Sequence, residues 1–374
     1  MQLKNIVGIS LFAFSLTCIA GENKKESDLI NQFSQQLEFD LASDDINGSV
    51  SALILKKNKI LWADAKGLLT SESKDKVDEN TIYRIGSLTK TFTSVLMMML
   101  QEDGVIDIDE SVEKYLPEVK SIDGYSEKTK FTFRHLASHT SGLIREPRDR
   151  KIHSGTNNQW QSIVLSAMPK TSFRYSVGER FSYSNIGFAI LGLALSRASD
   201  TDFITLVKRK IFEPLEMKNS FFNVPGNKMS FLAQGMAGGP LAELDMELPK
   251  QEHDGRGYKV PNGAIYSTPQ DMAKFLMALM GTKKLLSLES RQELHSSQTP
   301  TTRMRRNYGL GLQLFSSPEF STAGHSGSTP GYSAYFEYDL KNHYGVIIMR
   351  NYNWGNTNFD LRLNALLKSL SSNI

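Results

Sequence analysis

The strand-like segments of this 374-residue sequence lie near its two ends, and they constrain the fold more than any other feature. Residues 50–55 and 59–63 are separated by a short polar turn, which is typical of a hairpin. Residues 332–338 and 345–350 form a second such pair. Most segments between the two pairs have the apolar spacing of helices. We therefore predict an α+β fold, in which helices cover an antiparallel sheet.

The domain boundaries that we expect follow from this arrangement. The sheet takes its strands from about 48–70 and 308–352, and a mostly helical domain is inserted at about 105–260. A hydrophobic content of 40% is enough for a sizeable core. We expect one catalytic domain over residues 41–374, preceded by a polar leader and a first helix at 21–40.

The first 20 residues have the pattern of a secretory signal peptide. A short basic start precedes a mostly apolar stretch at 6–19, which is too short to span a membrane. We expect cleavage after Ala20 and a secreted or periplasmic mature chain without a transmembrane span. Cleavage would remove Cys18, the only cysteine, and leave no disulfide. The alternative is a lipoprotein anchored through Cys18, although Ser15 and Thr17 depart from the usual pattern of that anchor.

The composition argues against several classes of partner. The formal net charge is +3, and no cluster of lysine and arginine residues indicates nucleic-acid binding. His135 and His139 are spaced like zinc ligands on a helix, but no glutamate follows His135. The acidic stretch 103–110 lacks the pattern of a calcium loop. We expect no metal, cofactor or nucleic acid, and the sequence gives no indication of oligomeric state.

Ser326 lies in a stretch that begins like a nucleophile elbow, G-x-S-x-G. Such an elbow requires a helix directly after its serine. Here Ser328 replaces the last glycine of the pattern, and Pro330 and Gly331 oppose a helix. Too little chain follows Ser326 to supply an acid and a histidine in the usual order. The sequence therefore does not favour Ser326 as a nucleophile.

A serine followed three residues later by lysine is the other candidate nucleophile, because both side chains then share one face of a helix. Only at Ser87 does an apolar helix follow, at residues 91–100, which should be buried and should end near Gly104. Ser87 could merely cap that helix. Lys90, however, is costly one turn into a buried helix unless it has a role or a partner. Four serines match the spacing: Ser71, Ser73, Ser87 and Ser111.

Tyr183 and Asn185 form the only Y-x-N in the chain, and an apolar helix follows them at 186–195. Lysine is a poor base at its ordinary pKa of about 10.4, so burial or a neighbouring charge must lower that pKa. A second group usually shares the proton, and Tyr183 is the candidate. The alternative is an ordinary helix cap.

Five segments in this order resemble the beta-lactamase-related serine hydrolases. This group includes class C beta-lactamases, low-molecular-weight penicillin-binding proteins, D-aminopeptidases and related esterases. The resemblance runs from about Ile82 to Arg350 and implies a beta-lactamase/transpeptidase-like fold. The segments are residues 84–92, 133–142, 181–185, 261–269 and 324–327.

The resemblance implies a role for each residue of the catalytic centre. Ser87 would attack a carbonyl and form an acyl-enzyme. Lys90 and Tyr183 would share the role of general base, and Tyr183 would return the proton to the leaving group. The backbone N–H groups of Ser87 and Ser328 would hold the oxyanion.

The remaining matched residues would bind the substrate. Asn185 would orient a substrate amide, and His325 and Ser326 would bind the far end of the substrate, often a carboxylate. Gly327 would permit a close approach of the backbone. The sequence departs from many beta-lactamases, which have lysine at the place of His325. It also shows no clear match to a class C glutamine, since residues 143–147 occupy that region.

The function that we expect is therefore a serine hydrolase acting on amide or ester bonds of small molecules or peptides. D-Aminoacyl peptides and beta-lactam-like compounds are the expected substrates. One alternative is a carboxylesterase of the same family. Another is a non-catalytic protein that binds cell-wall peptides, against which the intact serine, lysine and tyrosine motifs argue.

Overall fold

A seven-stranded antiparallel sheet in the order β2-β1-β11-β10-β9-β8-β7 forms the centre of the computed structural model. The structure describes residues 10–44, 46–149, 152, 154–239, 242–253, 255–300, 307–318, 320–355 and 359–372. The strands are β1 (Ser49–Lys56), β2 (Lys59–Gly67), β7 (Asn307–Tyr308), β8 (Gln313–Ser316), β9 (Ser321–Thr329), β10 (Tyr332–Asp339) and β11 (Tyr344–Arg350).

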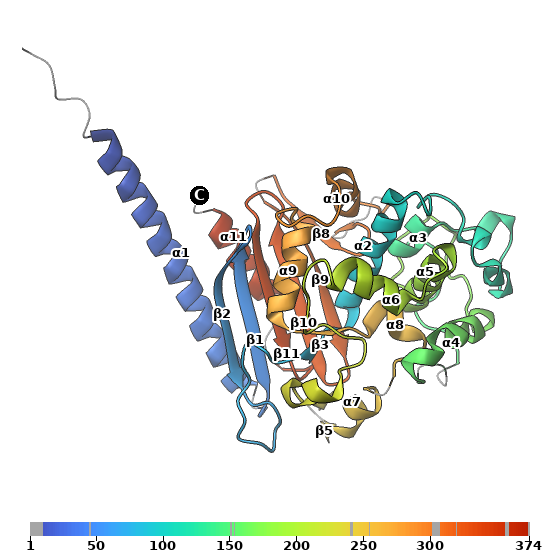
Figure 1. The fold of residues 1–374 in the computed structure, drawn as a ribbon, viewed down its shortest axis with the longest axis horizontal. Helices are drawn as coiled ribbons and strands as arrows, with labels where there is room; N and C mark the ends of the chain where they lie inside the picture. The colour runs from blue at the N-terminus through green and yellow to red at the C-terminus, as the bar shows by residue number, and fades with distance from the viewer. Residues whose placement is uncertain are drawn as a thin grey trace, which may run out of the picture.

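Helices cover both faces of this sheet (Figure 1). Two short two-stranded sheets join β3 (Tyr83–Arg84) to β6 (Tyr266–Ser267) and β4 (Ala237–Gly239) to β5 (Ala242–Asp245). The α-helices are α1 (Ser10–Ser43), α2 (Thr89–Glu102), α3 (Phe133–Ala137), α4 (Trp160–Ala167), α5 (Asn185–Ala198), α6 (Phe203–Val207), α7 (Glu247–Gln251), α8 (Val260–Gly263), α9 (Pro269–Leu279), α10 (Leu288–His295) and α11 (Phe359–Ser371).

Alternation along the strands divides the core into two layers. Leu53 pairs with Ile347 and Ile347 with Phe336, and all three point into the larger cluster under the helical part of the molecule. Ile54 and Val346, one position along, point instead into the cluster under α1 and α11. Successive side chains of a strand face opposite sides, so two buried faces require helices on both. The α+β architecture predicted from the sequence is confirmed.

The N-terminal helix α1 packs on the sheet through its C-terminal half. Ile30, Phe33 and Leu37 are buried there, and the ring of Phe33 lies 5.9 Å from the ring of Trp62 on β2. The helix passes the predicted cleavage site after Ala20, and residues 1–9 lie outside the described part of the chain. Signal-peptide cleavage therefore stays a prediction. Among the described residues, no helix has the length and apolarity needed to cross a membrane.

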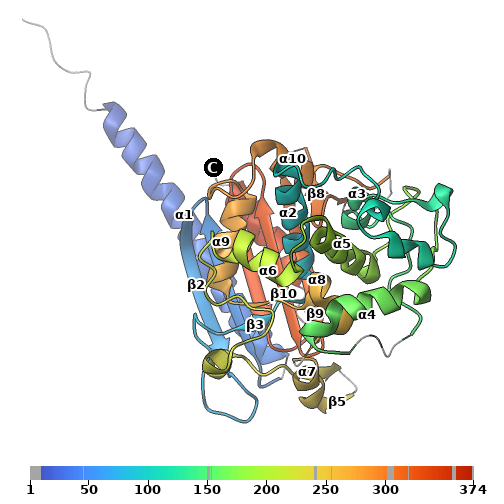
Figure 2. The same cartoon turned by 45° about the vertical axis from the view of Figure 1, so that its right-hand side comes forward.

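The helical insert stands beside the β8–β9 side of the sheet, as the turned view shows (Figure 2). Its packing centres on α2, whose residues are nearly all buried, as its apolar sequence predicts. The ring of Phe92 stacks on that of Phe275 at 3.7 Å and meets that of Phe212 edge-on at 5.9 Å. The helix ends at Glu102, just before Gly104, whose φ is 70°. The packing of α2 therefore connects the helical insert to the sheet. It also fixes the position of the turn directly before this helix.

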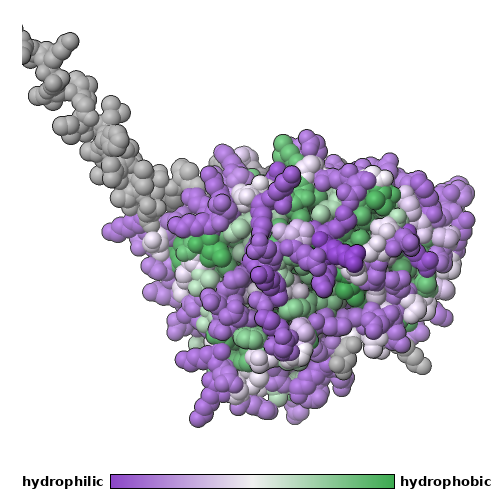
Figure 3. All heavy atoms as spheres, viewed as in Figure 1, coloured by the Kyte–Doolittle hydropathy of each residue, from purple (hydrophilic) through white to green (hydrophobic). Residues whose placement is uncertain are grey.

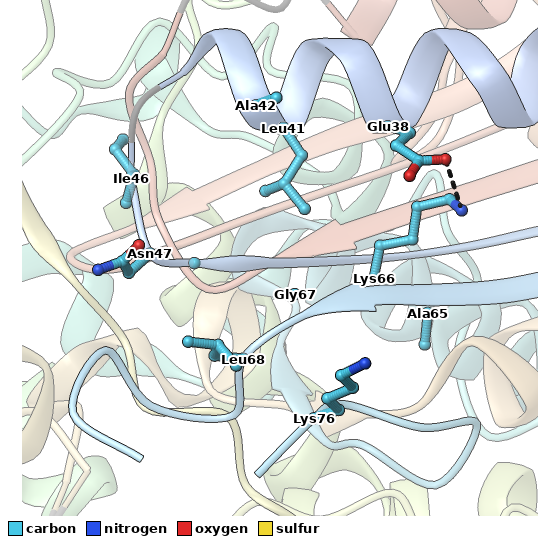
Figure 4. A pocket seen from close by; sticks show the side chains of 11 residues that line it. Glu38, Leu41, Ala42, Ile46, Asn47, Ala65, Lys66, Gly67, Leu68 and Lys76 are labelled. Atoms are coloured by element: carbon cyan, nitrogen blue, oxygen red, sulfur yellow. Dashed lines mark hydrogen bonds and ion pairs between the residues drawn. The ribbon is translucent and has the colours of Figure 1, made fainter. Parts of the chain in front are cut away.

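The outer surface of the molecule is mostly hydrophilic on the face shown in Figure 3, with hydrophobic areas scattered between polar side chains. One hollow of 530 Å³ lies between the end of α1 and the β1–β2 hairpin (Figure 4). Glu38, Lys66 and Lys76 are among its lining residues, and none of the predicted site residues is. The hollow is therefore separate from the candidate catalytic residues.

Replacing Phe92 by alanine should lower the free energy of unfolding by about 3–5 kcal/mol, because the fully buried ring leaves a cavity between α2 and α9. The same change at Phe39 on α1, whose side chain is 66% exposed, should cost less than about 1 kcal/mol. Urea denaturation of the two variants measures both values. Equal losses would contradict the packing described.

Candidate active site

Ser87 lies in the short 3₁₀-helix Gly86–Leu88, which leads directly into α2. Its Oγ lies 3.1 Å from the Nζ of Lys90, one turn along on the same helix face. Lys90 is fully buried, and its Nζ also donates a hydrogen bond to the backbone oxygen of Asn262 at 3.0 Å. The sequence spacing therefore predicted a contact that the structure contains.

Burial lowers the pKa of Lys90 well below its ordinary value of 10.5. The negative charge of Glu146 opposes this shift, whereas the positive charge of Arg145 adds to it. A buried amine without a paired carboxylate is most stable in its neutral form. Lys90 can therefore accept a proton, and the hydroxyl of Ser87, 3.1 Å away, is placed to supply one.

Two glycines bring strand β9 against this serine. Gly86 has a φ of 53°, and a Cβ built on it would lie 3.1 Å from the backbone nitrogen of Ser328. A Cβ on Gly327 would lie 2.1 Å from the backbone oxygen of Ile85. A side chain at position 327 would overlap that oxygen, and one at position 86 would be strained by the positive φ, so the glycines allow the strand to pass beside Ser87. Ser328 is exposed there, and a substrate can reach it.

Tyr183 comes from the loop before α5, close enough to Ser87 for that side chain to affect its pKa. Burial raises the pKa of Tyr183 to about 12, although the side chain of Ser87 and the charge of Arg145 act in the opposite direction. The Nζ of Lys90 lies 4.9 Å from the centre of the tyrosine ring. Tyr183 is therefore a phenol at neutral pH and can donate a proton close to Ser87 and Lys90.

His139 packs against the ring of Tyr183. The zinc-like spacing in the sequence did not predict this contact. Its ring lies 4.1 Å from that of Tyr183, and its Nδ1 accepts a hydrogen bond from the backbone N–H of Ser184 at 3.0 Å. His135 instead contacts Thr132 through its Nδ1. In the described part of the chain, no three His, Cys, Asp or Glu side chains are placed to hold a metal ion.

His325 is almost fully buried on β9, with 1% of its surface exposed. Its Nε2 lies 2.9 Å from the hydroxyl of Tyr308, and its Nδ1 lies 2.7 Å from the backbone oxygen of Ser326. Burial, and secondarily the charge of Lys90, lower the pKa of His325 to about 3. The imidazole is therefore neutral, with Nδ1–H donating to Ser326 and Nε2 accepting from Tyr308. Sequence reasoning missed Tyr308, which had no motif to mark it.

Asn185 is the first residue of α5 and is connected to Lys90 through Asn262. The Nδ2 of Asn262 donates to the backbone oxygen of Asn185 at 2.9 Å, while the backbone oxygen of Asn262 accepts from Lys90. The Nδ2 of Asn185 donates to Glu146 Oε1 at 2.6 Å. Glu146 lies in residues 143–147, the region that shows no clear match to the class C glutamine. A role for its carboxylate was not predicted from the sequence.

The structure thus brings the predicted residues together from three parts of the chain. The Nζ of Lys90 contacts both the hydroxyl of Ser87 and the ring of Tyr183. The rings of His325 and Tyr183 are 6.5 Å apart, and Ser326 is partly exposed on the same strand. The Nε2 of Gln313 lies 3.5 Å from Ser326 Oγ. The roles assigned to the binding residues stay predictions.

Comparison with known proteins identifies the family and the fold of the chain. The sequence matches the family model described as Beta-lactamase over residues 36–369. It is 34% identical to Beta-lactamase-like protein 2 of Dictyostelium discoideum over 233 residues, which cover 61% of this chain and 42% of that protein. It is 24% identical to Protein flp of Staphylococcus aureus (strain N315) over 330 residues, which cover 87% of this chain and 64% of that protein. The chain therefore spans less than two-thirds of the length of either relative.

Solved structures confirm the predicted beta-lactamase/transpeptidase-like fold. A class C beta-lactamase superposes with a TM-score of 0.73 at 20% identity, covering 94% of this chain and 96% of that one. A D-alanine carboxypeptidase from Burkholderia cenocepacia gives 0.74 at 19% identity, covering 93% and 99%. An octameric penicillin-binding protein homologue from Pyrococcus abyssi gives 0.74 at 24% identity, covering 86% and 73%.

Replacing Lys90 by methionine should change how stability depends on pH. With a folded-state pKa below 10.5, Lys90 holds fewer protons in the folded than in the unfolded chain, so its presence makes stability rise with pH in that interval. The methionine variant has no buried amine that must lose a proton on folding. Its advantage over the wild type in free energy of unfolding should therefore shrink as pH rises toward 10.5. Urea denaturation across pH measures it, and parallel curves would contradict a neutral Lys90.

Replacing Gly327 by alanine should displace β9 from Ser87, because the new methyl group would overlap the backbone oxygen of Ile85. We expect covalent labelling of Ser87 by a fluorophosphonate to slow by at least about tenfold. The control is Gly226→Ala, since a Cβ there would meet nothing within 4 Å. Unchanged labelling of a folded Gly327→Ala variant would show that the close contact is not needed.

Proposed function

Because the chain belongs to the beta-lactamase family, whose members are serine hydrolases, we propose that it cleaves amide or ester bonds through an acyl-enzyme on Ser87. The observation that carries the proposal is the contact of 3.1 Å between Ser87 Oγ and Lys90 Nζ, with the pKa of Lys90 lowered by burial. A neutral amine next to a hydroxyl is the arrangement that activates a serine.

The proposed reaction begins with transfer of the Ser87 proton to the Nζ of Lys90. The Oγ then forms a bond to the substrate carbonyl carbon, and the backbone N–H groups of Ser87 and Ser328 stabilise the resulting oxyanion. Tyr183, a phenol with a pKa near 12, donates its proton to the leaving amine or alcohol and recovers one from Lys90. Water releases the acyl group by the reverse sequence of proton transfers.

We propose D-aminoacyl peptides or beta-lactam-like compounds as substrates. A class C beta-lactamase and a D-alanine carboxypeptidase share the fold of this chain, and their names describe activity on compounds of these two kinds. Ser326 is partly exposed and Ser328 is exposed on β9, so both are available for the remainder of the substrate.

A carboxylesterase activity is the second candidate, and His325 is the observation that favours it. Its imidazole is neutral and buried, and both ring nitrogens already have partners. The strand therefore provides no fixed positive charge at this position for a substrate carboxylate. The binding of an ester substrate that has no carboxylate would not be weakened by the absence of this positive charge.

An intact-mass time course with a penicillin tests the proposal. We expect either an adduct on Ser87 or hydrolysed drug, and the Ser87→Ala variant should show neither. Ser71→Ala, at another serine followed three residues later by lysine, is the matched control and should keep the reaction of Ser87. An adduct on Ser326 would contradict the assignment of the nucleophile.

The Tyr183→Phe variant should acylate between about 10² and 10⁴ times more slowly, because it lacks the proton donor. If no acyl donor of any class, penicillin, ester or fluorophosphonate, modifies Ser87 in the folded chain, the protein is not a serine hydrolase. The non-catalytic interpretation, binding of cell-wall peptides, would then replace it.

A further inference from the structure

Two buried acceptor atoms beside the candidate active site have no hydrogen-bond donor among the described residues: Glu146 Oε2 and Asn185 Oδ1. They belong to side chains that are joined to each other by the bond of 2.6 Å between Asn185 Nδ2 and Glu146 Oε1. Asn185 is 9% exposed. Leaving a buried acceptor without a donor is unfavourable, so the pair is suited to a ligand that supplies donors.

The bond between the two side chains fixes which atoms remain free. An ionised carboxylate only accepts hydrogen bonds, so the Asn185 amide must turn its NH₂ group toward Glu146. This orientation leaves Oδ1 of Asn185 and Oε2 of Glu146 for a ligand. At these two atoms a substrate carbonyl would meet only acceptors, whereas an N–H group would find two partners.

These acceptors lie next to the acylation centre. Asn185 follows Tyr183 by two residues and is linked through Asn262 to Lys90. The charge of Glu146 acts on both Lys90 and Tyr183. A group held by the pair would therefore belong to the part of the substrate close to the scissile carbonyl.

The charges around Glu146 restrict how a cation could be held. The Nε of Arg145 lies 4.0 Å from Glu146 Oε1, the atom that also accepts from Asn185. Lys259 and Arg256 add positive charge, and Glu146 acts on the buried Lys259. Long-range attraction for a cation is thus weak. Recognition must come from direct hydrogen bonds to Oε2 and Oδ1.

We infer that the site selects acyl donors that carry a free amino group beside the scissile carbonyl, held by Glu146 and Asn185. An ammonium group provides three donors and a positive charge for the carboxylate. An N-acylated substrate presents one N–H and a carbonyl that the pair cannot satisfy. This inference rests on the proposed acyl-enzyme chemistry and narrows its substrates to aminoacyl compounds.

The test compares three p-nitroanilides on the full chain: D-alanine p-nitroanilide, its N-acetyl derivative, and propanoyl p-nitroanilide, which lacks the amino group. We expect kcat/KM to be at least about tenfold higher for the free amine than for either of the others at pH 7. In Glu146→Gln the preference, taken as the ratio of kcat/KM for the free amine to that for the propanoyl compound within the same variant, should fall to about onefold. The control is Glu127→Gln, whose side chain is 85% exposed in an ion pair with Lys130, and it should retain the preference.

Equal rates for the three compounds, or an undiminished preference in Glu146→Gln, would overturn the inference. Fluorophosphonate labelling separates it from the proposed function. If Ser87 is labelled but no p-nitroanilide is cleaved, the inference is wrong and the hydrolase assignment stands. If Ser87 is not labelled, the proposed function fails, and calorimetric binding of D-alaninamide to the Ser87→Ala variant decides the inference. Binding that N-acetyl-D-alaninamide does not share would support it, and equal or absent binding would overturn it.

Discussion

The candidate site depends on one buried interaction, the contact of Lys90 with Ser87 and with the backbone of Asn262. An amine without a paired carboxylate is unfavourable inside a protein, and losing its charge is the way to reduce that cost. The same desolvation that disfavours the ammonium form makes Lys90 a base. The fold therefore accepts a costly residue in its central helix, and the proposed chemistry follows from that cost.

The rest of the structure serves to hold this contact in place. The aromatic stacking of Phe92 on Phe275 anchors α2, so the turn that carries Ser87 cannot shift relative to the helix. Gly86 and Gly327 let β9 approach that turn more closely than any side chain would allow. His139 lies against Tyr183, and together these contacts give the three proposed catalytic groups a fixed geometry before any substrate binds.

The sequence predicted most of the fold because its signals are local. Strand alternation, the polar hairpin turns and the apolar helix after Lys90 each follow from the spacing of residues within a few turns. Ser87, Lys90 and Tyr183 could be named from short patterns. Tyr308, His139 and Glu146 could not be assigned their places, because their contacts join segments far apart in the chain. No pattern marks Tyr308 or Glu146, and the patterns that include His139 do not say what it contacts. The carboxylate of Glu146 shows this most clearly, since only the folded chain pairs it with Asn185.

The ionisation of Lys90 is the most direct test of this account. Chain containing ¹³C-labelled lysine can be titrated by NMR, and the Lys90→Met variant identifies the resonance of Lys90. The account predicts a pKa well below 10.5 in the folded, unliganded protein, because burial outweighs the attraction of Glu146. A pKa at or above 10.5 would mean that Lys90 remains an ammonium group, and it could then not be the base that activates Ser87.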